Sequence, residues 1–193
     1  KQLIFSMKFT QSFDDDSFEK LRFWTLSVRG HYSYRTITRE FLELLEKKLH
    51  NVSQKNRKDK AVCVIHYRLG DLLLLDNKKP IDPTAILKEL KRISKNSDFA
   101  PIEIYSDTPK HAMELLNPLG LRNISTPNAD TVSLLERAIQ SEYFLGTSSK
   151  ISFWIVAIRS VVFNKPSSIP AGNFLEISGL LNKEFKNVYL YGD

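Results

Sequence analysis

Hydrophobic and polar positions follow two alternating periods along most of this chain. A short continuous apolar run at 61–65 is bounded by polar residues, which predicts a buried strand at 61–66. The spacing then becomes helical after Asp82-Pro83, a pair that is typical of a helix start. The alternation recurs along the chain. It predicts strands at 61–66, 102–105, 121–124, 143–145 and 161–163. It also predicts four helices: one that starts after 82–83, one that starts at 106–109, one that contains 134–139 and one at 151–160.

Strands that alternate with helices over short connections imply a parallel sheet covered on both faces. We therefore expect an α/β fold with a Rossmann-like parallel sheet and flanking helices. Apolar residues at helical spacing also predict a helix at 36–49, with Ile37, Phe41, Leu44, Leu45 and Leu49 on one face.

The polar stretch 50–60 breaks this pattern and is the expected internal boundary. Residues 1–60 would form a mostly helical or irregular segment that packs on the core or on a missing first domain. Residues 61–193 would form the Rossmann-like domain. The acidic run at 14–17 is either the cap of a short helix at 17–24 or a metal-binding cluster, and capping is the simpler interpretation.

Composition narrows the class of protein. The 193 residues are 42% hydrophobic and 26% charged, as in an ordinary globular protein, and the net charge of +6 favours anionic partners. Cys63 is the only cysteine, which excludes an intrachain disulfide and a cysteine-rich metal site. No apolar stretch reaches 18 residues, so we expect a cytoplasmic protein, with peripheral attachment to the inner face of a membrane as an option.

Three of the predicted strands end in polar residues. Because parallel strands finish at one edge of a sheet, where ligands bind in open α/β folds, these groups should converge there. Arg68 is suited to a diphosphate, and hydroxyl and N–H groups before a helix suit an anion. The three groups are His66, Arg68 and Asp71; Ser106 and Asp107; and Thr147, Ser148 and Ser149.

Each group also has an ordinary structural interpretation. Arg68 and Asp71 could pair across a turn. Ser106 or Asp107 could cap the helix that contains Pro109, and Ser148 or Ser149 could cap the helix at 151–160. Their joint position at one sheet edge favours a ligand site, where Asp107 would accept hydrogen bonds from ribose hydroxyls or a base edge.

The polar groups also resemble those of a known family. Residues 65–71, Ile-His-Tyr-Arg-Leu-Gly-Asp, resemble the His-x-Arg-x-x-Asp motif of fucosyltransferases that use GDP-fucose, in particular the bacterial α-1,2-fucosyltransferases. In chain order, 30–35 resemble the family's Gly-Tyr-Phe-Gln-Ser-x-x-Tyr stretch, 104–107 its Phe-Ser-Asp-Asp strand end, and 145–154 its Asn-Ser-Ser/Thr-Phe-Ser-Trp-Trp segment. The likeness spans roughly 26–165.

The resemblance implies the C-terminal nucleotide-sugar domain of a GT-B glycosyltransferase. It would transfer fucose from GDP-fucose to a glycan hydroxyl with inversion, without a metal or other cofactor, in bacterial surface polysaccharide synthesis. Arg68 would stabilise charge on the leaving diphosphate. His66 is a candidate base because its ordinary pKa lies near neutrality, although a role in orienting Arg68 fits equally well.

Departures from the family pattern support a second hypothesis. Leu69, Thr108 and Phe153 replace a second arginine, a second aspartate and a tryptophan, and the chain has no Gly-Gly-Leu-Gly-Asn-Gln segment. A truncated or divergent relative that binds a nucleotide sugar without turnover would show such changes. Nucleic-acid binding has only the net charge and the basic loop at 54–60 in its favour, so we expect no nucleic-acid partner.

Overall fold

The computed structural model describes residues 10–13, 27–30, 42–44, 46–47, 63–74, 79–94, 101–171 and 185–192. Its contacts separate two units, Lys1–Thr38 and Arg39–Asp193. In the first unit, β1 (Thr10–Phe13) pairs in parallel with β2 (Ser27–Gly30), and the hydrophobic pattern predicts neither strand. The helix predicted at 17–24 and the boundary predicted at residue 60 lie outside the described residues.

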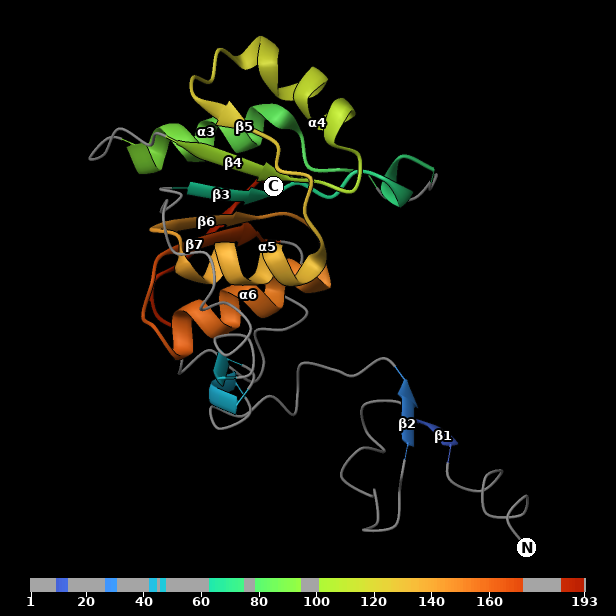
Figure 1. Cartoon of the computed structure of the whole chain (residues 1–193). Coiled ribbons are helices and arrows are strands. Elements are labelled where there is room, and N and C mark those ends of the chain that lie inside the picture. The colour runs from blue at the N-terminus through green and yellow to red at the C-terminus, as the bar shows by residue number, and fades with distance from the viewer. Residues whose placement is uncertain are drawn as a thin grey trace, which may run out of the picture. The chain divides into compact units, whose positions relative to one another are not determined.

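The second unit contains a six-stranded sheet in the order β5-β4-β3-β6-β7-β8, in which every pair of neighbours is parallel. This arrangement confirms the α/β fold with a Rossmann-like parallel sheet, and Figure 1 shows β5, β4, β3, β6 and β7 in this order. The strands are β3 (Cys63–His66), β4 (Ile102–Tyr105), β5 (Ile124–Ser125), β6 (Tyr143–Gly146), β7 (Ser167–Pro170) and β8 (Val188–Tyr191).

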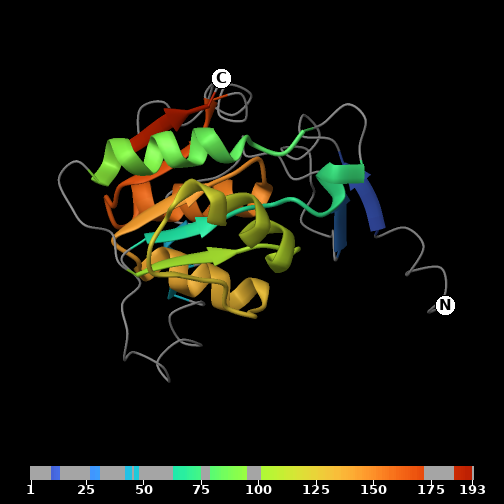
Figure 2. The same cartoon turned by 90° about the horizontal axis from the view of Figure 1, so that it is seen from above.

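Helices cover both faces of this sheet, as a sheet of buried parallel strands requires. The helical elements are η3 (Asp71–Leu74), α3 (Pro83–Ser94), α4 (Pro109–Leu116), η4 (Asn117–Leu119), α5 (Thr131–Gln140) and α6 (Lys150–Val161). Residues of α3 and α4 share one buried cluster on one face, whereas α5 contacts α6. Figure 2 shows α3, in green, and α5, in amber, on opposite sides of the sheet.

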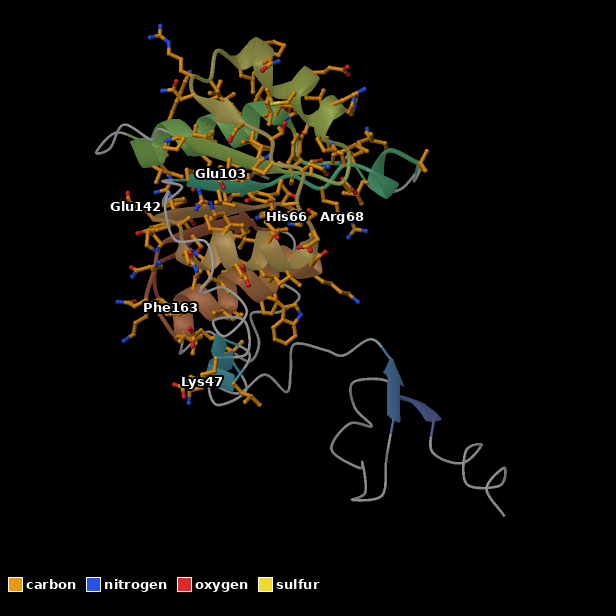
Figure 3. The ribbon with its side chains drawn as sticks, viewed as in Figure 1. Lys47, His66, Arg68, Glu103, Glu142 and Phe163 are labelled. Carbon is orange, nitrogen blue, oxygen red and sulfur yellow. The ribbon has the colours of Figure 1, made fainter. Side chains whose placement is uncertain are left out.

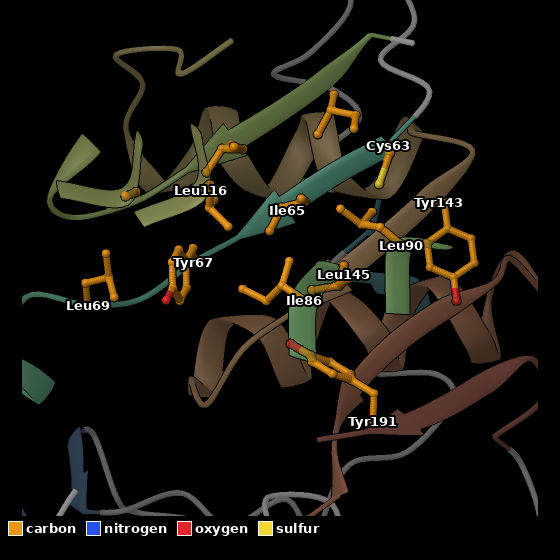
Figure 4. Packing of buried hydrophobic residues seen from close by; sticks show 13 residues of the cluster. Cys63, Ile65, Tyr67, Leu69, Ile86, Leu90, Leu116, Tyr143, Leu145 and Tyr191 are labelled. Atoms are coloured by element: carbon orange, nitrogen blue, oxygen red, sulfur yellow. The ribbon is translucent and has the colours of Figure 1, made fainter. Parts of the chain in front are cut away.

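The cluster under α3 and α4 is built on the chain that enters and leaves β3. Cys63, Ile65, Tyr67 and Leu69 alternate along this segment, and all four are fully buried in the cluster. Figure 4 shows them beside residues of α3, α4 and β6. Because successive side chains of an extended strand point to opposite faces, the intervening residues face α5 and α6 instead.

The strand predicted at 161–163 is wrong. Helix α6 continues to Val161, which is buried, and the next strand is β7 at Ser167–Pro170. Its two serines look too polar for a central strand, yet both are fully buried with bonded hydroxyls. Ser167 Oγ accepts a hydrogen bond from Arg159, and Ser168 Oγ bonds to Tyr143 and Glu89.

The predicted helix at 36–49 agrees with the structure where it is described, because 42–44 and 46–47 are helical. Its predicted apolar face does not agree, since Leu42 is fully buried whereas Leu44 is 54% exposed. None of the helices in the described ranges is both long and apolar enough to cross a bilayer.

Among the described residues, Arg159 is the largest side chain that is fully buried, and it holds the ends of three elements together. Its guanidinium donates to the carbonyls of Ser141, Glu142 and Pro166 and to the hydroxyl of Ser167. It also donates to carbonyls in the last turn of α5, where a cation is favoured by the helix dipole. Burial lowers the pKa of this guanidinium to about 9, which leaves it charged at neutral pH.

We predict that Arg159→Met lowers the free energy of unfolding by about 3–5 kcal/mol, because buried carbonyls lose their donor. Urea denaturation measures the change. Lys165→Met is the matched control: Lys165 Nζ donates to the carbonyls of Ile139 and Gln140 in the same helix end, but it is only half-buried. Its loss should cost about 1 kcal/mol. Equal losses would contradict a special role for the buried guanidinium.

Candidate functional site

The three polar groups predicted to converge do lie at one edge of the sheet. Strand β3 pairs with β4 on one side and with β6 on the other, and His66 is in register with Tyr105 and Gly146. The residues that follow each strand are therefore neighbours in space. Figure 3 shows His66 and Arg68 together at this end, whereas Glu142, which precedes β6, lies toward the opposite end.

Thr147 connects the end of β6 to the end of β3. Its buried hydroxyl donates to the carbonyl of His66 over 2.8 Å and accepts from the backbone N–H of Arg68 over 3.0 Å. The hydroxyl predicted to contact a ligand is thus engaged in fixing the backbone on both sides of Tyr67. The described geometry gives Thr147 a positioning role.

Asp107 makes the corresponding connection from β4. One oxygen, Oδ1, accepts the N–H groups of Leu69 and Gly70 at 3.0 and 3.1 Å. A Cβ on Gly70 would lie 2.4 Å from the other oxygen, so only glycine permits this approach. Desolvation raises the pKa of Asp107, but the N–H groups outweigh it and hold the pKa below its usual value.

The capping interpretations are settled differently at the two helices. Asp107 does not cap α4, whose cap residue is Thr108, while Ser106 Oγ accepts the N–H of Thr108. Ser149 does cap α6, because its hydroxyl accepts the N–H of Ile151 at 3.2 Å. The side chain of Asp71 is not among those that the structure describes. The predicted pairing of Arg68 with Asp71 therefore lies outside the described residues.

A cavity of about 570 Å³ opens at this edge. Five of the predicted residues line it, and Thr147 and Ser148 do not. The five are His66, Arg68, Ser106, Asp107 and Ser149. The volume falls in the range of cavities that hold small-molecule ligands.

The far wall comes from the β5–α5 connection, which the sequence analysis did not assign to the site. Asp130, Thr131 and Leu134 line the cavity there. Asp130 is the cap of α5, and its Oδ1 accepts the N–H of Ser133 at 2.8 Å. A signal was present, because an aspartate shortly before an apolar helical pattern is typical of a helix cap. The first turns of α5 and α6 therefore face one cavity.

Lys150 is the second cation of the cavity wall and was also missed. It is the first residue of α6, directly after the capping Ser149, so the predicted helix start could have indicated it. Arg68 and Lys150 supply two positive side chains, Asp107 and Asp130 two negative ones, and both helix N-termini add partial positive charge. Such a site suits a ligand that carries anionic oxygens and hydroxyl groups.

His66 differs from the sequence-based expectation in its chemistry. Its side chain is buried, and its Nδ1 lies 2.8 Å from Ser152 Oγ. Burial lowers the pKa of His66 to about 4, with Asp107 opposing and Arg68 adding to the shift. The sequence-based expectation was that the ring would titrate near neutrality. It does not, because the ring is uncharged at neutral pH.

Within the described residues, no group of three or more His, Cys, Asp or Glu side chains is placed to hold a metal ion. Scanned against models of protein families, the chain matches none, and a search among curated proteins likewise finds no match.

The lowered pKa of His66 has a consequence for stability. Between pH 6.5 and about 4, an unfolded histidine binds a proton that the folded one does not, so stability falls as the pH falls through this window. The loss is at most about 3 kcal/mol. We predict that His66→Asn, which does not titrate but keeps an acceptor near the Nδ1 position, removes this part of the pH dependence.

Urea denaturation at a series of pH values from about 4 to 7 tests this. His111→Asn, a histidine substitution on α4 outside the cavity lining, is measured in parallel. A wild-type profile that His66→Asn does not flatten would show that His66 is not the group responsible.

Proposed function

We propose that this chain is the nucleotide-sugar-binding domain of a glycosyltransferase that transfers fucose from GDP-fucose to a glycan hydroxyl with inversion. One observation carries the proposal: Arg68 and Lys150 line a single cavity with the first turn of α6 at the carboxyl edge of a parallel sheet. A diphosphate is the ligand for which this combination is best suited. The ordered motif resemblance supports GDP-fucose as the donor.

In the proposed reaction the acceptor oxygen forms a bond to the anomeric carbon while the bond to the β-phosphate oxygen breaks. Negative charge grows on the departing diphosphate, and the acceptor hydroxyl gives up its proton to a base. Arg68 and Lys150 line the cavity, and in this proposal they stabilise the charge on the departing diphosphate more strongly than they stabilise the bound donor, which is how such groups accelerate a reaction. The acceptor would be a glycan of surface polysaccharide. The net charge of +6 would favour peripheral attachment of the protein to the anionic inner face of a membrane.

A noncatalytic relative that retains nucleotide-sugar binding is the second candidate. Leu69 is fully buried in the core cluster, where the family has a second arginine, and Thr108 is the cap residue of α4. Leu69 therefore serves the core in this chain, whereas the Thr108 side chain makes no capping hydrogen bond. A transfer assay with radiolabelled GDP-fucose on the full chain separates the candidates, because a binding module gives no fucosylated product and no free GDP.

We predict that Arg68→Ala weakens GDP binding about ten- to a hundredfold and Lys150→Ala about three- to tenfold, as measured by titration calorimetry. Both losses should shrink at high ionic strength, because salt screens the charges. Arg122→Ala is the matched control. Arg122 is exposed and precedes β5, so it lies at the amino-terminal ends of the strands, whereas the cavity lies at their carboxyl ends. Unchanged affinity in Arg68→Ala would remove that residue from the proposed role.

A further inference from the structure

One ring nitrogen of His66 is hydrogen-bonded within the protein. His66 lines the cavity, and its Nδ1 lies 2.8 Å from Ser152 Oγ. Among the described residues, none makes a hydrogen bond with Nε2. A neutral imidazole carries its proton on only one of these nitrogens, and the hydrogen bond at one determines what the other can do.

Ser152 decides which nitrogen that is. It is fully buried in the first turn of α6, and its hydroxyl already accepts the N–H of Thr147 at 3.2 Å. If His66 also donated from Nδ1, the hydroxyl hydrogen of Ser152 would have no acceptor among the described residues. A buried donor without a partner is costly, whereas donation from Ser152 to Nδ1 satisfies all three groups.

The site of Ser152 is also sterically closed. A Cβ on Gly146 would lie 2.7 Å from Ser152 Cβ, so the serine packs directly against the end of β6. The hydroxyl thus lies between the backbone N–H of Thr147 and the ring of His66, and it is hydrogen-bonded to both.

We propose that Ser152 holds His66 as the Nε2-protonated tautomer, so that the ring presents a neutral hydrogen-bond donor to an anionic oxygen in the cavity. The identification of that oxygen as a phosphate oxygen rests on the proposed function. His66 then binds the leaving group alongside Arg68, and no proton is transferred from or to its ring. Ser152 is a positioning residue that acts through His66.

The low pKa of His66 is consistent with this role, because the ring stays neutral throughout the physiological range. The charged groups that act on the ring are Asp107 from the β4 side and Arg68 from its own segment, and they oppose each other. A neutral donor adds specificity for the oxygen without adding charge to a cavity that already contains two cations.

Nitrogen-15 NMR of histidine-labelled protein tests the tautomer directly, because protonated and unprotonated ring nitrogens have distinct chemical shifts. The chain has four histidines, so the His66→Asn variant identifies the signals of His66. In the wild-type chain without ligand, we expect Nε2 to be protonated and Nδ1 unprotonated. The reverse assignment would overturn the inference whether or not the protein binds GDP.

Ser152→Ala tests the cause. Without the hydroxyl, the signals should move toward a mixture of tautomers, and GDP affinity should fall about three- to tenfold. Ser160→Ala is the matched control, because Ser160 is a buried serine of the same helix whose hydroxyl bonds to the backbone of Lys186. It should change neither the tautomer nor the affinity.

The two arms separate this inference from the proposed function. A correct tautomer that depends on Ser152, in a protein that does not bind GDP, would contradict the nucleotide ligand and leave the Ser152–His66 arrangement supported. An Nε2-protonated ring that is unchanged in Ser152→Ala would contradict the positioning role of Ser152.

Discussion

The site depends on how the backbone is satisfied after β3. Four consecutive N–H groups, from Tyr67 to Gly70, have acceptors on the two neighbouring strands or their ends. The carbonyl of Tyr105 and the carboxylate of Asp107 come from the β4 side, and the hydroxyl of Thr147 comes from the β6 side. A buried loop needs such partners, because unpaired backbone groups are costly away from water. Here these hydrogen bonds also fix the residue that carries the charge, Arg68.

The need to pair these backbone N–H groups explains why several polar residues at this edge have structural roles. Thr147 and Asp107 occupy positions at strand ends that are typical of ligand contacts, yet their hydrogen-bonding atoms are largely used by the loop. Ser149 is used by the first turn of α6. The cavity therefore relies on the groups that these residues position: Arg68, Lys150, the ring of His66 and the helix N-termini.

Hydrophobic periodicity was sufficient to predict the order of the α-helices and strands from β3 to α6, because all of them except the two-residue β5 bury apolar residues. It failed at β7, where Ser167 and Ser168 are buried through hydrogen bonds to Arg159, Tyr143 and Glu89, partners distant in sequence or on other elements. The convergence of strand ends followed from the parallel pairing. The roles of Ser152 and Asp107 could not be predicted in this way. They depend on contacts between residues that are 86 and 37–38 positions apart, and no local pattern contains such contacts.

The local pattern did predict one property of the site, namely which side chains after β3 enter the core and which line the cavity. The alternation of the β3 strand continues beyond its last residue: Cys63, Ile65, Tyr67 and Leu69 enter the cluster under α3 and α4. His66 and Arg68 belong to the other set, and they line the cavity beside the first turn of α6. An arginine at position 69 would have to place its charge in an apolar core, which is unfavourable without a partner. Leucine at this position thus keeps the alternation intact, and the phosphate-binding chemistry proposed for this edge falls on Arg68 and on Lys150 from α6.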